Sequence, residues 1–141
     1  MKTNNKTIIS VQTIVNAPIE KVWNCWTNPE DIVKWNYASE DWHSPHAKND
    51  VRINGNFNYR MEAKDGSMGF DFYGVYDHII IQKQIEYTMG DGRKAKIIFK
   101  ETNNKVEIIE NFEAENENSI ELQKSGWQAI LNNFKKHTEG K

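Results

Sequence analysis

Several features are scarce or missing in this 141-residue sequence, and each absence removes a class of function. Cys25 is the single cysteine, so no internal disulfide can form, which fits a reducing cytoplasm. No hydrophobic run is long enough to span a bilayer, and the first residues lack the apolar segment of a secretory signal. Acidic and basic residues nearly balance at a net charge of -2, which leaves no basic stripe for binding nucleic acid.

Familiar catalytic motifs are missing as well. The chain has no glycine-rich phosphate loop, serine nucleophile motif or dinucleotide fingerprint. The stretch 37–50 holds metal-ligand types, namely His43, His46 and two aspartates, but Pro45 precludes a regular helix and nothing completes a zinc pattern. We therefore expect a solvated loop there, with Trp42 as a candidate lid, and neither a metal site nor a cofactor. Cys25 has no basic neighbour closer than Lys21, which favours a packing thiol over a nucleophile.

The length predicts one domain, expected at residues 7–138, with residues 1–6 loosely held. Its elements run in the order strand, two short helices, further antiparallel strands and one long helix. Prolines in first turns indicate that the short helices begin near residues 19 and 29. Residues 37–50 show no regular spacing of apolar residues and are expected to be a loop. Alternating apolar residues predict strands at 7–15, 51–54, 57–61, 70–81, 84–89, 95–99 and 105–113.

The best-specified element is a helix at residues 119–137. Four apolar residues recur at i, i+3, i+4 and i+7, which puts them on one stripe of the helix. We expect Asn118 to cap its first turn, with Glu121 reaching back as a capping box. Gly126 is expected to mark a close approach by another element. The stripe consists of Trp127, Ile130, Leu131 and Phe134.

The order of elements and four stretches of residues resemble a known family. The stretches include Ala17, Pro18, Val22, Trp23, Trp26, Thr27, Asn28, Pro29, Trp35, Asp50, Val51, Arg52, Gly55, Phe57, Gly126, Trp127, Leu131 and Phe134. The chain resembles the START and birch-pollen-allergen (SRPBCC) superfamily. Within it, the chain is similar to homologues of the activator of the ninety-kilodalton heat-shock protein's ATPase, C-terminal-domain type. The resemblance implies an α+β helix-grip fold, in which a curved antiparallel sheet of about seven strands wraps around the long C-terminal helix. One departure is Asn54-Gly55, where the family usually has paired glycines.

The inward faces of the sheet and the last helix can either enclose a ligand cavity or close into a solid core. Apolar stripes usually form core, but the resemblance and the tyrosines favour a cavity, because a buried phenol needs a polar partner. Gly74 is expected to leave space on this face. The candidate ligand-binding residues are Trp35, Phe57, Tyr59, Met61, Phe70, Phe72, Tyr76, Tyr87, Ile97, Phe99, Ile108, Glu110, Trp127, Ile130, Leu131 and Phe134.

Glu110 is the unusual member of this set, because it shares the inward parity of its strand with Ile108 and Phe112. If it is buried, its carboxyl group is a polar anchor for a ligand, or an acid or base with a raised pKa. A bulge or an edge position would instead expose it. The sequence leaves both alternatives open.

Three functions remain open. The leading hypothesis is a non-enzymatic cytoplasmic module that binds a small apolar or amphipathic molecule, with no nucleic-acid or membrane-spanning role. The second, implied by the resemblance, is a co-chaperone that stimulates a heat-shock ATPase. The third is an enzyme of the cyclase or lyase type, for which only Glu110 and the histidines of the 37–50 loop offer an acid or base.

Overall fold

The computed structural model describes residues 7–141, so the expected loose segment at residues 1–6 lies outside the described residues. Within the described range, the strands and helices follow one another largely in the predicted order. The elements are β1 (Ile8–Val15), α1 (Ile19–Thr27), α2 (Pro29–Trp35), β2 (Trp42–His43), β3 (Ala47–Asn49), β4 (Asn56–Ala63), β5 (Gly69–Ile80), β6 (Gln84–Met89), β7 (Lys94–Thr102), β8 (Lys105–Glu113) and α3 (Ile120–Gly140).

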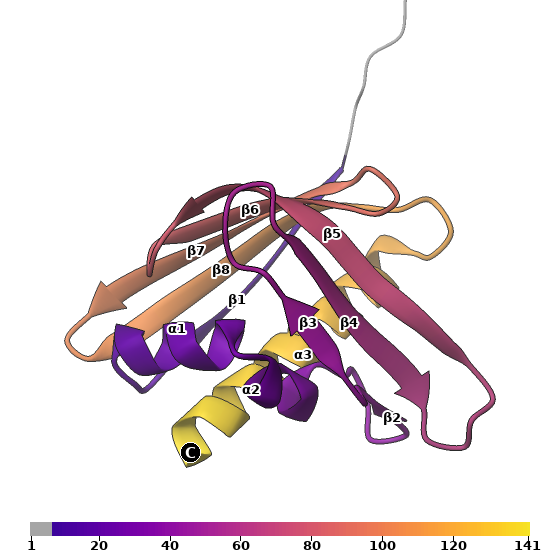
Figure 1. Cartoon of the computed structure of the whole chain (residues 1–141), viewed down its shortest axis with the longest axis horizontal. Coiled ribbons are helices and arrows are strands. Elements are labelled where there is room, and N and C mark those ends of the chain that lie inside the picture. Colours follow the sequence, from indigo (N-terminus) through magenta and orange to yellow (C-terminus); the bar gives the residue numbers. More distant parts are fainter. Residues whose placement is uncertain (1–6) are drawn as a thin grey trace, which may run out of the picture.

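The strands form one antiparallel sheet with the order β1-β8-β7-β6-β5-β4, and both β2 and β3 pair along the free side of β4. The sheet curls around α3, while α1 and α2 cover one end of that helix (Figure 1). The predicted helix-grip fold is confirmed, with eight strands in place of about seven. The additional strands, β2 and β3, lie inside the expected loop at residues 37–50, and they are too short to show an alternating pattern.

The start of the sheet after this region also differs from the expectation. Residues 51–54 form a turn, and β4 begins only at Asn56. Asn54 has a φ of 69°, the left-handed region that asparagine tolerates better than most residues, so it can stand where the family usually has a glycine. At Gly55 a Cβ atom would lie 2.1 Å from the Asp50 carbonyl oxygen, so this position requires glycine.

The helix α3 begins one residue later than expected and continues to Gly140. Ser119 is its N-cap, because the Ser119 hydroxyl accepts a hydrogen bond of 3.0 Å from the Leu122 amide. The expected cap, Asn118, instead donates its side-chain amide to Glu115. Both residues are suitable cap types, and the Asn118 side chain is already engaged by the Glu115 carboxylate.

The C-terminal half of α3 is the part of the helix that enters the core. Leu131 and Phe134 are buried, and the Phe134 ring lies 4.8 Å from Trp26 and 5.0 Å from Trp35, both in edge-on geometry. Such aromatic pairs contribute about 1 kcal/mol each beyond the area they bury. Polar contacts to β1 add to this, since Lys135 donates to the Ile14 carbonyl at 2.6 Å. The two short helices therefore hold one end of α3 firmly.

A buried charge cluster fixes the same end of the helix. The Asp31 carboxylate, on α2, accepts hydrogen bonds from His137 at 2.8 Å and from Lys141 at 2.6 Å. Burial alone would raise the pKa of Asp31, but the hydrogen bonds from Lys141 and His137 outweigh it and hold that pKa below its usual value. Because the folded pKa is depressed, this stabilisation is present above the unfolded pKa and is lost as the pH falls.

Asp31→Asn should therefore lower the free energy of unfolding at pH 7 by roughly 1.5 kcal/mol, since His137 and the half-exposed Lys141 lose their charged acceptor. Glu30→Gln, at the exposed neighbouring position, is the matched control and should change stability by less than about 0.5 kcal/mol. Urea unfolding at pH 7 and at pH 3 measures both. Equal loss for the two variants, or a loss from Asp31→Asn that does not shrink at pH 3, would contradict the assignment.

Gly126 does not mark a close approach, contrary to the expectation. A Cβ atom built at this position meets nothing within 4 Å. The glycine therefore only adds backbone entropy to the unfolded chain. We expect Gly126→Ala to raise the free energy of unfolding by about 1 kcal/mol, the helix-propensity difference between the two residues. Thermal unfolding measures this, and a lower melting temperature would show that the glycine has a packing role.

Candidate functional site

A cavity of about 260 Å³ lies between the sheet and the N-terminal half of α3. Apolar and aromatic side chains from β4, β5, β6 and α3 form most of its wall. A shallower surface hollow adjoins it and shares Phe70, Phe72 and Arg93 with it. Phe70 is 47% exposed, so the cavity reaches the surface on this side. The sheet face is thus partly filled by its own side chains and partly open.

Eleven of the sixteen candidate residues line this cavity. They are Trp35, Phe57, Tyr59, Met61, Phe70, Phe72, Tyr76, Tyr87, Glu110, Trp127 and Ile130. The structure therefore brings these residues together, and their contact with a ligand stays a prediction. Trp42 is not one of the lining residues, although its ring lies 5.9 Å from that of Phe70.

The other five candidates belong to the packed core and not to the cavity wall. They are Ile97, Phe99, Ile108, Leu131 and Phe134, each at most 4% exposed. Ile97, Phe99 and Ile108 have the predicted inward parity on their strands, and Leu131 and Phe134 are buried on α3. Phe99 and Phe134 lie at the end of the molecule that α1 and α2 cover, where Trp26 packs against both. Parity in the sequence identifies the inward face, but it does not indicate how far along that face the short helices extend.

Five lining residues are absent from the sequence-based set. They are Trp26, Asn36, Ile85, Arg93 and Glu115. Ile85 shares the inward parity of Tyr87, so the strand pattern could have identified it. Arg93 and Glu115 lie in turn and loop segments where no period exists, and only the tertiary fold brings them to the cavity.

Gly74 lies on the inward face as expected, but it does not enlarge the cavity. A Cβ atom at this position would lie 2.8 Å from two ring carbons of Phe57 and 2.5 Å from the Thr88 carbonyl oxygen. The Phe57 ring therefore occupies the space that the missing side chain leaves. Because Phe57 is itself a lining residue, Gly74 sets the position of one cavity wall.

Tyr59, Tyr76 and Tyr87 supply the hydroxyl groups among the described residues that line the cavity. The Tyr76 hydroxyl donates a hydrogen bond to the Asn49 side-chain oxygen, which links the cavity to β3. Burial raises the pKa of Tyr76 to about 12, and it also raises those of Tyr59 and Tyr87. All three phenols are therefore neutral at physiological pH.

Glu110 is buried in the wall, which excludes the alternative of an exposed edge or bulge position. Its side chain is on β8, paired in regular register with Val11 and Ile97, and the residue is only 7% exposed. Among the residues that the structure describes, no hydrogen-bond donor or cation contacts this carboxyl group. Burial raises the pKa of Glu110 to about 8. The group can therefore donate a proton or hydrogen bond when protonated and pair with a cation when ionised.

The raised pKa of Glu110 predicts that the free energy of unfolding depends on pH. Because the folded state binds the Glu110 proton more tightly than the unfolded state, stability should fall as the pH rises from about 4.5 to 8. Glu110→Gln cannot ionise, so at pH 9 it should be more stable than the wild type by a few kcal/mol, with little difference at pH 4.5. Denaturant unfolding across this range tests the prediction. Glu107→Gln, on the outward parity of β8, is the control, and a similar pH response in both variants would contradict it.

One group of metal-ligand types also assembles within residues 7–141, away from the cavity. Cys25, Asp31 and His137 place one ligand atom each within 4.8 Å of one another. Asp31 is already hydrogen-bonded by His137 and Lys141, and burial raises the pKa of the Cys25 thiol, which disfavours the thiolate that binds metals. This arrangement serves to attach α3, as described above. His43 and His46 do not belong to such a group.

The comparisons with known proteins agree with this geometry. The profile of the family described as "Activator of Hsp90 ATPase homolog 1-like protein" matches residues 16–139. The chain belongs to this family. Among solved structures, it is similar to an AHSA1-like protein from Aeromonas hydrophila with a TM-score of 0.89 and 36% identity, covering 95% of this chain and 93% of that one. It is also similar to the protein Chr148 from Cytophaga hutchinsonii with a TM-score of 0.81 and 53% identity, covering 94% and 92% of the two chains.

Solved structures of lower sequence identity share the fold alone. Protein NE0264 from Nitrosomonas europaea has a TM-score of 0.80 at 16% identity, covering 94% of each chain. No curated protein matches the sequence. Within the described residues, no helix combines the length and apolar character that a membrane crossing requires.

Proposed function

We propose that this AHSA1-like chain is a binding module that holds one small apolar or amphipathic molecule between the sheet and α3. The observation that carries the proposal is the cavity of about 260 Å³ with a mainly aromatic wall and a few polar groups. Ligand pockets typically have this composition, with volumes from about 300 Å³ upward. The volume therefore favours a small ligand, such as a compound with one to three rings.

Apolar burial would supply most of the affinity. A ligand that buries about 200 Å² of apolar surface gains roughly 5 kcal/mol, before the cost of lost motion is subtracted. The polar groups of the wall would then set its orientation. Glu110 and Asn36 are the best placed, because both are buried and both line the cavity, and the Asn36 side-chain nitrogen has no hydrogen-bond partner among the described residues.

The neutral fluorescent probe N-phenyl-1-naphthylamine, which brightens in apolar surroundings, tests the cavity. We expect saturable 1:1 binding to the wild type and at least tenfold weaker binding to Ile130→Trp, whose larger side chain fills the space. Leu122→Trp is the matched control, because Leu122 is on the same helix but is 60% exposed and does not line the cavity. Thermal unfolding confirms that both variants fold. Equal binding by the three proteins would contradict the proposal.

Native mass spectrometry of the protein purified from its own host addresses the natural ligand. A stoichiometric small molecule that denaturing extraction releases would support the proposal and identify the chemistry of the ligand. A clean unliganded mass, together with no probe binding, would favour a function on the outer surface.

The family description suggests a second candidate, stimulation of a heat-shock ATPase. The profile match to residues 16–139 is the observation that favours it. An ATPase assay with the host's Hsp90-type chaperone tests this candidate, and an unchanged rate at saturating protein would contradict it. A cytoplasmic location stays a prediction that follows from the single cysteine.

A further inference from the structure

The environment of Glu110 indicates what kind of ligand the cavity would accept. The Glu110 carboxyl group lies in the wall with apolar cross-strand neighbours, Val11 on β1 and Ile97 on β7. A buried carboxyl group without a hydrogen bond or counter-ion is costly, and natural proteins seldom retain one. Within residues 7–141 no side chain supplies that partner. In the unliganded protein the partner is therefore solvent that enters the open cavity, and a ligand that displaces this solvent has to supply a complementary group.

Aromatic rings surround the same part of the cavity. Trp127 stacks on Phe112, two residues along β8 from Glu110, with ring centres 3.7 Å apart and planes at 10°. Phe72 lies edge-on to both Trp127 and Tyr87, at 6.0 Å and 6.3 Å. The exposed faces of such rings attract cations, and aromatic walls are a common way to bind substituted ammonium groups. A carboxylate beside several rings is thus suited to an organic cation.

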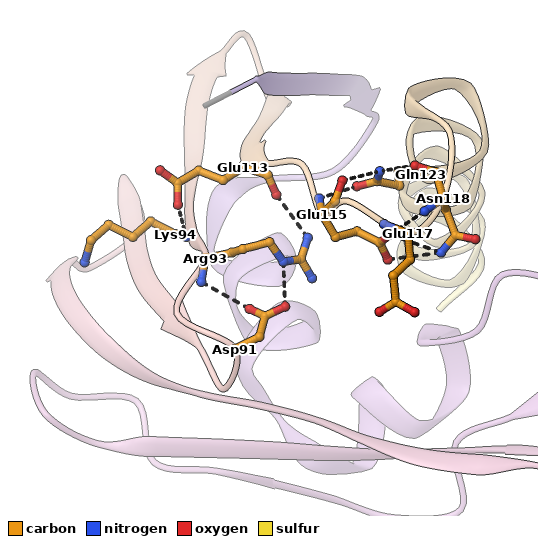
Figure 2. A network of polar contacts seen from close by, with 8 residues as sticks. All are labelled: Asp91, Arg93, Lys94, Glu113, Glu115, Glu117, Asn118 and Gln123. Atoms are coloured by element: carbon orange, nitrogen blue, oxygen red, sulfur yellow. Dashed lines mark hydrogen bonds and ion pairs between the residues drawn. The ribbon is translucent and has the colours of Figure 1, made fainter. Parts of the chain in front are cut away.

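The basic group nearest the cavity is already engaged. Arg93 is a lining residue, but its guanidinium group donates to Asp91 at 2.7 Å and to the Glu113 carbonyl oxygen at 3.0 Å (Figure 2). Glu115, also a lining residue, accepts hydrogen bonds from the amides of Glu117 and Asn118. Arg93 therefore does not compensate Glu110, and the carboxylates of Asp91 and Glu115 offset its positive charge at this rim.

We propose that the cavity binds an amphipathic organic cation, whose ammonium group pairs with Glu110 against the rings of Phe72, Tyr87 and Trp127. This inference rests on the proposed binding function and specifies the ligand class. A neutral ligand could instead accept a hydrogen bond from the protonated acid. The aromatic wall and the acidic groups at the rim favour the cation, because both interact better with positive charge than with a neutral acceptor.

Glu110 is the group whose titration should control this binding. The other titratable side chains that line the cavity are Tyr59, Tyr76 and Tyr87, which stay neutral up to pH 9, together with Arg93 and Glu115 at the rim. Glu115 has a pKa below its usual value, chiefly because the Asn118 amide donates to its carboxylate, so it is ionised throughout. A cation requires ionised Glu110, so cation affinity should rise with pH through the Glu110 pKa of about 8.

A matched pair of probes tests the proposal. Benzyltrimethylammonium carries a permanent charge, and neopentylbenzene is its uncharged isostere with carbon in place of nitrogen. Competition against N-phenyl-1-naphthylamine gives both affinities, and calorimetry measures the cation directly. We expect the cation to bind at least about tenfold more tightly than its isostere at pH 9, and its affinity to rise about tenfold from pH 7 to pH 9.

In Glu110→Gln, the ratio of cation to isostere affinity should fall to about one and lose its pH dependence. Glu107→Gln, on the outward parity of the same strand, should keep the wild-type ratio. Equal affinities for the two probes in the wild type would overturn the cation proposal while leaving the binding function intact, provided that the fluorescent probe binds. If none of the three compounds binds, the proposed binding function fails as well.

Discussion

The unequal packing of α3 along its length, dense in the C-terminal half and more open in the N-terminal half, is the constraint on which the rest of the structure depends. Its C-terminal half is held by Phe134 packed against Trp26 and Trp35, and by the contacts of the buried Asp31 carboxylate with His137 and Lys141. The N-terminal half has no comparable helix beside it. There Trp127 of α3 stacks on Phe112 of β8. The space that remains between this half of the helix and the sheet is the cavity. The same arrangement therefore explains both the solid core and the open site.

The division of the inward face follows from this constraint. Where α1 and α2 extend, inward residues such as Phe99 and Ile108 are packed solid. Beyond them, the aromatic residues of β4, β5 and β6 pack against one another along the sheet and form one wall of the cavity. A carboxyl group on that wall keeps its proton to an unusually high pH, because burial destabilises the charged form and no described residue compensates it. The buried Glu110 carboxyl group lowers the stability of the fold at neutral and higher pH. Functional sites often contain such destabilising residues, so this cost is consistent with a role of Glu110 in binding a ligand.

Much of this fold is predictable from residue patterns, and the failures have physical reasons. The strands β6 and β8 are predicted with their correct bounds, and the proline-initiated helices α1 and α2 with their correct first residues, because local sequence determines them. The short strands β2 and β3 depend on pairing with β4 and leave no local signal. For the site, parity correctly places Glu110 and Tyr87 inside. It cannot show which inward residues reach the cavity, or that a loop residue such as Arg93 joins them, because both depend on how far α1 and α2 cover the sheet.

The cavity holds a carboxyl group that has no partner among the described residues. The most direct test is a pH titration of the Glu110 side-chain carboxyl carbon by NMR, with Glu110→Gln used to assign its signal. The account predicts an apparent pKa near 8 in the unliganded protein. A midpoint near 4.5, the ordinary value for glutamate, would show that the group is solvated or paired, and would contradict the account.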